Sequence, residues 1–301
     1  MKPIKILLFG KNGQVGWELQ RSLAPLGELI ALDYASQDFC GDFTNLGGLA
    51  KSIRDIAPDV IVNAAANTAV DKAESEPELA RTINALAPGV LAQEAKCLGA
   101  WLVHYSTDYV FDGSGDRPWL ETDMTGPLSV YGKTKLAGEE AVRSAACKHL
   151  IFRTSWVYAA RGGNFAKTIL RLAQERDSLK VIDDQIGTPT GADLLADVTA
   201  HAIRTAMQRP EVIGLYHLTA GGQTSWHAYA SFVIDCARQA GVEIKVSPDA
   251  IQAVPTSAFP TVAKRPMNSR LDTTRFQNTF DLKLPHWQTG VSRMLNESLG
   301  K

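Results

Sequence analysis

A glycine-rich turn between an apolar run and an amphipathic stretch constrains the fold more than any other feature. The apolar run covers residues 4–9, the turn reads GKNGQVG, and residues 14–26 have helical apolar spacing. The glycines let the backbone turn sharply and let a ligand approach it closely. A helix beginning there points free N–H groups and its positive dipole end at a phosphate. The context favours dinucleotide binding over a turn used only for packing; its three glycines are Gly10, Gly13 and Gly16.

The first half of the chain repeats this alternation of strand and helix. Further buried strands are expected at residues 28–33, 59–66, 100–107 and 149–158. Helices are expected at residues 44–57 (with Thr44 as N-cap), 76–99 (bent near Pro88) and 136–146. The alternation predicts an α/β fold, a doubly wound parallel sheet of Rossmann type with helices on both faces. Ligands of such sheets bind beyond the carboxyl ends of the strands.

The second half is less regular, which suggests a smaller C-terminal substrate lobe. Helices are expected at 164–177, 191–208, 225–241 and 287–299, a strand at 214–220, and an ordered loop region at 253–271. We predict an NAD(P)-binding domain over residues 1–158, to which 191–222 returns. The substrate lobe would then comprise residues 159–190 and 223–301.

Composition narrows the function classes. The net charge of −1 gives no electrostatic footprint for nucleic acid or an anionic membrane. No apolar segment is long enough for a signal sequence or a membrane span, so we expect a cytoplasmic protein without a membrane partner. The four cysteines are far apart and form no CxxC, which is typical of reduced thiols. The six histidines lack zinc-ligand spacing.

An acidic residue, Asp33, ends the second expected strand, 17 residues beyond Gly16. At this place a carboxylate accepts hydrogen bonds from the adenosine 2′-hydroxyl and favours NADH. Lys11, inside the glycine turn, would offset a 2′-phosphate, so NADPH stays open. The alternative for Asp33 is a cap on the following turn.

Two further stretches are candidates for the cofactor site. Asp42 would meet the adenine amino group, or equally would cap a helix, and Phe43 would stack nearby. The run NAAANT at residues 63–68 has small side chains that allow either close cofactor approach or tight packing.

The fourth expected strand ends in Ser106, Thr107 and Asp108, and Tyr131 and Lys135 follow. A hydroxyl at the strand end can bond a substrate carbonyl. Residues four apart share one face of a helix, so Lys135 would place a cation beside the Tyr131 phenol. Tyrosine ordinarily titrates near pH 10, and a nearby cation lowers that pKa. The phenol could then protonate a ketone oxygen as hydride reaches the carbon. YxxxK alone is weak evidence; its order after the other motifs favours catalysis.

Together these motifs resemble the extended short-chain dehydrogenase/reductase family over essentially the whole chain. The matching stretches are LLFGKNGQVGWEL, DVIVNAAANTAVDKAE, YSTDYVFDG, YGKTKLAGE, FRTSWVY and RPMNSRL. The resemblance implies NADPH or NADH as hydride donor and a dTDP-linked 4-keto-6-deoxy sugar as substrate. It implies reduction at C4 to dTDP-L-rhamnose, for cell-surface polysaccharide.

The resemblance also implies roles for individual residues. The catalytic set would be Thr107, Tyr131 and Lys135. Besides the three glycines, Tyr131 and Lys135, the cofactor would contact Gln14, Val15, Asp33, Asp42, Phe43, Ala66, Asn67, Thr68 and Tyr105. The sugar nucleotide would contact Thr107, Asp108, Trp156, Arg265 and Ser269. Asn67 stands where relatives often carry histidine.

Some relatives dimerise through carboxylate-bound Mg²⁺. A homodimer is therefore an expectation, with Asp193 and Glu297 as candidate ligands; solvated surface carboxylates are the simpler interpretation.

Three alternatives stay open. A nucleotide-sugar dehydratase would need an Asp-Glu pair after the strand-end threonine, where this chain has Asp108 and Tyr109. An epimerase would use the same tyrosine and lysine. A non-catalytic NADP-binding regulatory subunit would not need the intact catalytic set.

Overall fold

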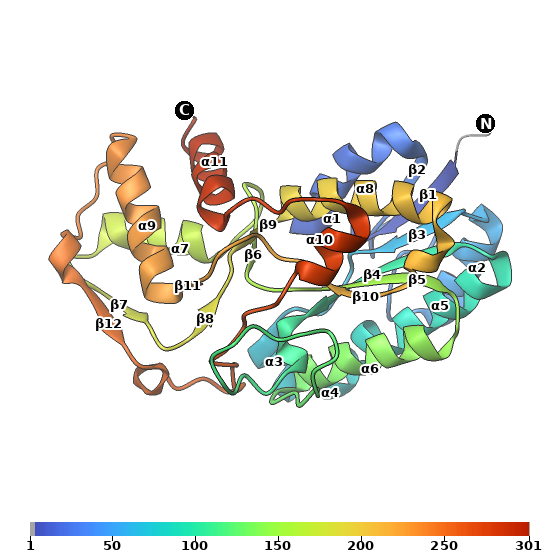
Figure 1. The fold of residues 1–301 in the computed structure, drawn as a ribbon, viewed down its shortest axis with the longest axis horizontal. Coiled ribbons are helices and arrows are strands. Elements are labelled where there is room, and N and C mark those ends of the chain that lie inside the picture. Colours follow the sequence, from blue (N-terminus) through green and yellow to red (C-terminus); the bar gives the residue numbers. More distant parts are fainter. Residues whose placement is uncertain (1–3, 301) are drawn as a thin grey trace.

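A six-stranded parallel sheet, in the order β10-β5-β4-β3-β1-β2, forms the centre of the larger lobe (Figure 1). The computed structural model describes residues 4–300. The strands are β1 (Ile4–Phe9), β2 (Gly27–Leu32), β3 (Val60–Asn63), β4 (Trp101–Thr107), β5 (Lys148–Thr154) and β10 (Gly214–His217). The direction of winding reverses between β1 and β3. The predicted doubly wound parallel sheet is thus confirmed, and a ligand crevice is expected at this reversal.

Helices cover both faces of the sheet. One face carries α1 (Gln14–Leu23) and α8 (Ala192–Gln208), and the other carries α2 (Leu46–Ile56), α5 (Ala87–Leu98) and α6 (Val130–Ser144) (Figure 1). Alternate β1 side chains enter the two cores, with Ile6 and Leu8 on one face and Leu7 and Phe9 on the other. Burial on both faces explains why this strand reads as a continuous apolar run.

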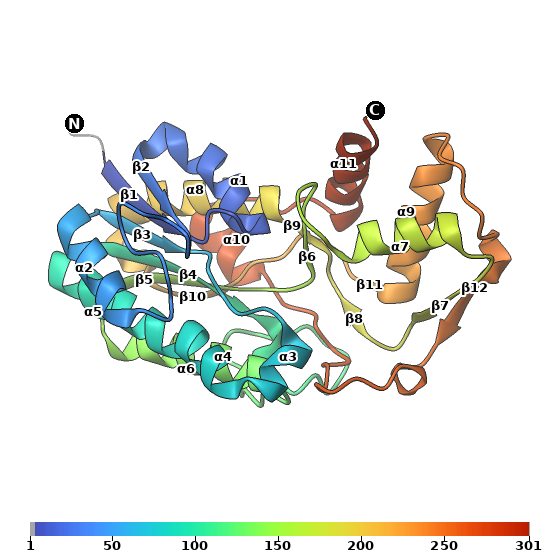
Figure 2. The same cartoon turned by 180° about the vertical axis from the view of Figure 1, so that it is seen from behind.

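The smaller lobe lies beside the sheet and has its own core (Figure 2). Its helices are α7 (Phe165–Glu175), α9 (Trp226–Gln239) and α11 (Trp287–Leu299). Its strands pair β7 (Leu179–Ile182) with β12 (Ile251–Val254) and β8 (Ile186–Gly187) with β11 (Thr224–Ser225). Between the lobes, β6 (Val157–Tyr158) pairs with β9 (Thr190–Gly191).

Several expected element boundaries were wrong for local reasons. The N-cap of α2 is Asn45, not Thr44, because the Asn45 side chain accepts from the Gly48 N–H at 2.9 Å. The helix expected over 76–99 is divided into α4 (Pro77–Arg81), a π-helical turn (Thr82–Leu86) and α5. The turn lies just before Pro88, which has no N–H to donate.

One helix was not expected at all: α3, which covers Val70–Ser75. Helix α6 begins at Val130, so Tyr131 lies in its first turn.

The segment 274–280, expected in the smaller lobe, instead packs on the sheet. It forms α10 (Thr274–Phe280), and Phe276 and Phe280 join the core beside Tyr216 of β10. Residues 192–217 also lie in the larger lobe, as α8 and β10. We therefore propose the predicted division with α10 moved to the dinucleotide-binding unit; residues 1–3 and 301 lie outside the described residues.

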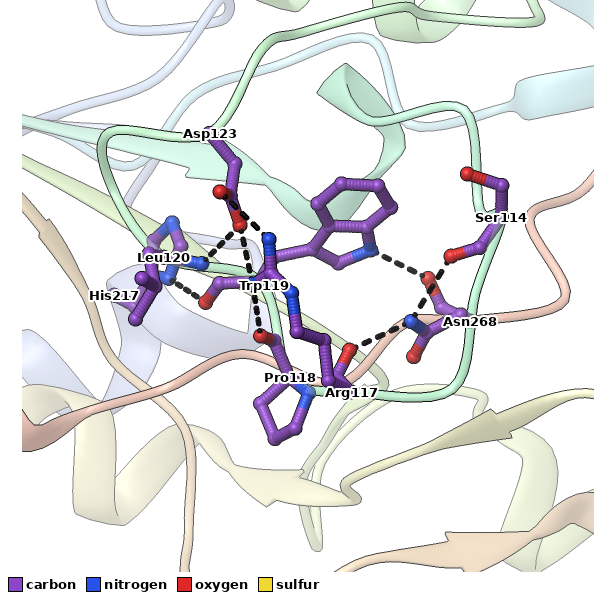
Figure 3. Close-up of polar contacts among 8 residues, drawn as sticks. All are labelled: Ser114, Arg117, Pro118, Trp119, Leu120, Asp123, His217 and Asn268. Atoms are coloured by element: carbon purple, nitrogen blue, oxygen red, sulfur yellow. Dashed lines mark hydrogen bonds and ion pairs between the residues drawn. The ribbon is translucent and has the colours of Figure 1, made fainter.

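A polar network fixes the RPMNSRL segment to the loop that follows β4 (Figure 3). The Asn268 amide donates to the carbonyls of Ser114 (3.2 Å) and Arg117 (2.8 Å), and the Trp119 indole donates to the Asn268 carbonyl (3.1 Å). His217 donates from Nδ1 to the Trp119 carbonyl at 3.0 Å, since burial lowers its pKa to about 3 and keeps it neutral. Asn268 thus anchors the segment that carries two predicted substrate residues.

Candidate active site

Two adjoining cavities follow the carboxyl ends of the strands at the winding reversal. One, of about 520 Å³, is lined by Gly10, Asp33 and Phe43; the other, of about 700 Å³, is lined by Thr107 and Tyr131. Both include Gly13, Ala64 and Ala66 in their walls. The hollow is therefore long enough to present one end to an adenosine and the other to a reacting group.

The glycine turn has the geometry of a dinucleotide cradle. Gly10 has φ +87°, and a Cβ on Gly16 would lie 2.0 Å from the Gly10 carbonyl oxygen. Gly13 is exposed to the cavity, and a Cβ there would meet its nearest atom at 3.4 Å. Within the described chain, no side chain caps α1 at Gly13, so its first N–H groups face the cavity free. These residues fit a nicotinamide dinucleotide. Gln14 also lines the reacting end, and Val15 packs on the sheet core.

Asp33 caps the turn that follows it, which was the alternative to ribose binding in the sequence analysis. Its carboxylate accepts from the Asn12 amide, from the Ala35 N–H at 3.1 Å and from the Ser36 hydroxyl at 3.0 Å. Lys11 reaches the same Ser36 hydroxyl at 3.3 Å. Asp33 still lines the adenosine end, so its contact with a ribose stays a prediction.

Asp42 and Phe43 are less available than expected. Asp42 caps a turn by accepting from the Thr44 N–H (2.9 Å) and hydroxyl (2.8 Å). The Phe43 ring is buried against Phe9, edge to face at 5.5 Å, which limits stacking on a base. Sequence reasoning missed Tyr34, which is 81% exposed and lines the same cavity. Its position directly after Asp33 was the available signal.

The NAAANT stretch divides into residues that face the cleft and one that does not. Ala66 and Thr68 line the larger cavity. Asn67 lines neither cavity; its side-chain oxygen accepts from the Ala69 N–H at 3.3 Å, which forms a turn just before α3. The buried Asn84 amide holds the Asn67 backbone at both N–H (2.8 Å) and carbonyl (3.0 Å). Asn84 is a support that the sequence did not suggest.

Thr107 and Tyr131 meet at the reacting end of the cleft. Thr107 ends β4, accepts from the Tyr109 N–H at 3.2 Å and donates to the Asp108 carboxylate at 3.0 Å. Burial raises the pKa of Tyr131 to about 12, opposed by a hydrogen bond with Thr107. The phenol is therefore protonated at neutral pH, whereas the sequence suggested a lowered pKa.

The position of the Lys135 ammonium explains why the pKa of Tyr131 is not lowered as the sequence suggested. Its ammonium is 2% exposed and donates to the Tyr105 carbonyl at 2.6 Å rather than to the phenol. Burial lowers the pKa of Lys135 to about 8, and the Glu139 carboxylate opposes that shift. The Tyr105 hydroxyl bonds Thr199 in the core at 2.6 Å, so Tyr105 offers this site its carbonyl.

The predicted substrate residues gather beside this centre. Trp156 adopts φ +47° and stacks on Trp226 with ring centroids 3.5 Å apart. The Arg265 guanidinium pairs with Asp71 through contacts of 2.5 and 3.2 Å, and it lines the larger cavity. A third cavity, of about 310 Å³, adjoins the larger one and contains Trp156, Arg265 and Ser269. Sequence reasoning missed other residues of its wall, among them Tyr109, Phe165, Lys180, Gln185 and Trp226.

Asp108 is buried in this centre, and burial raises its pKa to about 6 against hydrogen bonds from Ser269 and Thr107. Among residues 4–300, its second carboxylate oxygen has no hydrogen-bond partner. A carboxyl group held this way resists ionisation, so it costs stability when it is charged.

Asp108→Asn should therefore raise the stability of the fold at neutral pH by up to about 3 kcal/mol. The native carboxyl binds its proton more tightly than the unfolded one. As the pH rises from about 4 to about 6, the wild-type protein should therefore lose stability. The stability gain of the Asp108→Asn variant over the wild type should appear over the same pH range. Denaturant unfolding at several pH values measures this. Asp112→Asn is the matched control with the opposite sign, because the Ser114 N–H lowers the pKa of Asp112.

The two candidate metal ligands line one small cavity at the edge of α8 and α11. Asp193 lies 3.6 Å from Arg293, and it shares a cavity of about 270 Å³ with Glu18 and Glu297. Burial raises the pKa of Glu18, with smaller contributions from both other carboxylates. Within residues 4–300, no group of three or more His, Cys, Asp or Glu residues could hold a metal ion.

The fold and the site define a Rossmann-type oxidoreductase that takes a nicotinamide dinucleotide, with the tyrosine–lysine helix of the short-chain dehydrogenases/reductases. The chain belongs to the family described as the RmlD substrate binding domain, whose model matches residues 4–299.

Relatives with known names are similar to this chain over nearly its full length. The chain is 65% identical over 294 residues to a dTDP-4-dehydrorhamnose reductase of Salmonella typhimurium, covering 98% of each. Its fold is similar to the crystal structure of a dTDP-4-dehydrorhamnose reductase of Clostridium acetobutylicum (TM-score 0.87, 37% identity, 99% of this chain and 100% of that one). It is also similar to that of Bacillus anthracis in complex with NADP (TM-score 0.86, 33% identity, same coverage). None of the described helices is both long and apolar enough to cross a membrane.

Proposed function

We propose that this protein reduces the C4 ketone of dTDP-4-dehydro-L-rhamnose to dTDP-L-rhamnose, with NADPH or NADH as reductant, as the last step in supplying that sugar for cell-surface polysaccharide. One observation carries the proposal: the protonated Tyr131 phenol and the Thr107 hydroxyl meet in a cleft continuous with the glycine turn. The names of the relatives support the choice of substrate.

The chain's own residues would perform the proton chemistry. When bound, the reduced nicotinamide supplies the hydride. Tyr131 donates its proton to the ketone oxygen, which is possible because burial keeps the phenol protonated. Lys135 provides the nearby positive charge that stabilises the resulting phenolate. Thr107 bonds the same oxygen and orients it.

The third cavity suits the nucleotide part of the substrate. Trp156 and Trp226 offer aromatic faces to a base, whereas Lys180 and Arg265 offer cations to a diphosphate. Asp71 holds the Arg265 guanidinium in a fixed plane. Since this cavity shares Tyr109, Trp156 and Arg265 with the reacting end, base and ketone can be bound together.

An absorbance assay tests the proposal. NADPH and NADH should both be oxidised with the dTDP-linked ketone, and more slowly with a UDP-linked analogue. The assay should be run with and without EDTA, because a loss of turnover in EDTA would indicate the Mg²⁺ requirement that the sequence left open. Unchanged absorbance, from folded protein shown to bind the cofactor, would exclude a reductase and leave the dehydratase, epimerase and regulatory-subunit alternatives. A homodimer stays a prediction, which sedimentation would test.

A further inference from the structure

A fully buried ion pair lies behind the catalytic cleft, and the chemistry above does not use it. Glu139 of α6 is 0% exposed and Arg153 of β5 is 2% exposed. The guanidinium donates to both carboxylate oxygens, from Nε at 2.9 Å and from Nη2 at 2.6 Å. The Ser106 hydroxyl of β4 donates to the same carboxylate. Neither charged residue lines the two cavities of the cleft.

The Glu139 carboxylate joins β4 and α6, which carry the reacting groups, to β5, which contributes to the cavity wall. Ser106 directly precedes Thr107 on β4. Glu139 follows Lys135 by one helical turn and Tyr131 by two, on the same face of α6. Arg153 directly precedes Thr154, which lines the larger cavity. A shift of any one element would break a buried charge-assisted bond, which is costly.

The charge of Glu139 also affects Lys135. Lys135 and Arg153 are two buried cations, and Glu139 is the anion that acts on Lys135 among the described residues. Of the other titratable groups nearby, Asp108 is the acid beside Tyr131, and the two histidines are neutral. Burial, with a smaller contribution from Lys135, lowers the pKa of His104, and burial does the same to His217 beside Arg153. Tyr131 remains protonated.

We propose that Glu139 is a positioning residue of this site, which aligns β4, α6 and β5 and supplies the counter-charge that keeps Lys135 as an ammonium. The proposal rests on the proposed reductase function for its consequence in turnover. Without Glu139, Lys135 loses its proton at lower pH, and the phenolate left by Tyr131 loses its stabilising cation.

Glu139→Gln tests this, because glutamine keeps the shape of the side chain and removes the charge. The alkaline limb of the kcat profile should move down by about one pH unit, since losing an opposite charge one helical turn away lowers the pKa of a buried ammonium by roughly that much. NMR titration of the Lys135 ε-carbon should show the same shift. That readout needs no turnover, so it would still test Glu139 if the wild-type protein proved inactive on the ketone.

Glu94→Gln is the matched control. Glu94 of α5 is also buried and also accepts two bonds from one guanidinium, that of Arg54, but it is not among the groups that act on Lys135. It should lower stability and leave both pH readouts unchanged. If Glu139→Gln does not fold, Glu139→Gln with Arg153→Gln removes the unpaired cation as well. The pKa of Lys135 should then still fall, but by less, because the repulsion from Arg153 is lost together with the attraction of Glu139. A wild-type Lys135 titration in a folded Glu139 variant would overturn the proposal.

Discussion

Replacing Tyr131 with phenylalanine is expected to lower kcat by about 10²–10⁴-fold, the range that one general acid contributes. Phenylalanine fills the same space beside Tyr109, whose ring lies 5.4 Å away, so the cleft should keep its shape. NADPH affinity should therefore change little. Steady-state kinetics with the dTDP-linked ketone, together with cofactor binding by fluorescence, separate the two effects.

Tyr216→Phe is the control for loss of a buried hydroxyl. Tyr216 bonds the Val212 carbonyl at 2.8 Å within the sheet core, far from the reaction chemistry proposed here. That variant should lose about 1 kcal/mol of stability and keep its turnover. Near-normal turnover by the Tyr131 variant would remove the phenol from the mechanism.

Gly16→Ala should destabilise the fold by about 3 kcal/mol, because its Cβ would lie 2.0 Å from the carbonyl oxygen of Gly10. The turn between β1 and α1 would have to open, and dinucleotide binding should be lost as well. Chemical denaturation and cofactor titration measure the two losses.

Gly13→Ala separates folding from binding. Its Cβ would meet its nearest atom at 3.4 Å, an ordinary contact, yet Gly13 is exposed to both cavities. This variant should unfold at the wild-type denaturant concentration but bind NADPH more weakly. Wild-type cofactor affinity in Gly13→Ala would argue against a cofactor at this turn.

Local patterns were enough to predict the sheet. Strands such as Ile4–Phe9 are apolar on both faces and are joined by amphipathic helices, so each element is recognisable from a few consecutive residues. The short strands β7 and β12 escaped prediction because Leu179 pairs with Ile251, 72 positions away. Helix α10 was not expected, and its residues were assigned to the smaller lobe, because nothing local shows that Phe276 meets Tyr216.

The residue types of the site were predictable, but their electrostatics were not. Spacing placed Tyr131 and Lys135 on one face of α6, as expected. The pKa of Tyr131 is raised because the phenol is buried. The Lys135 ammonium points to the Tyr105 carbonyl, which accepts its hydrogen bond. Neither fact can be read from the spacing of the two residues. The side chains of Asn67 and Asp33 each accept from the N–H two residues further on, a local bond that short polar side chains readily form.

The fate of the hydride tests the central claim most directly. With NADPH carrying deuterium at the transferable position, NMR of the dTDP-sugar product should show one deuterium, at C4 of the sugar, for each NADPH consumed. A dehydratase or an epimerase would convert its substrate without net consumption of added NADPH. Conversion of the sugar with no deuterium at C4 would contradict the account.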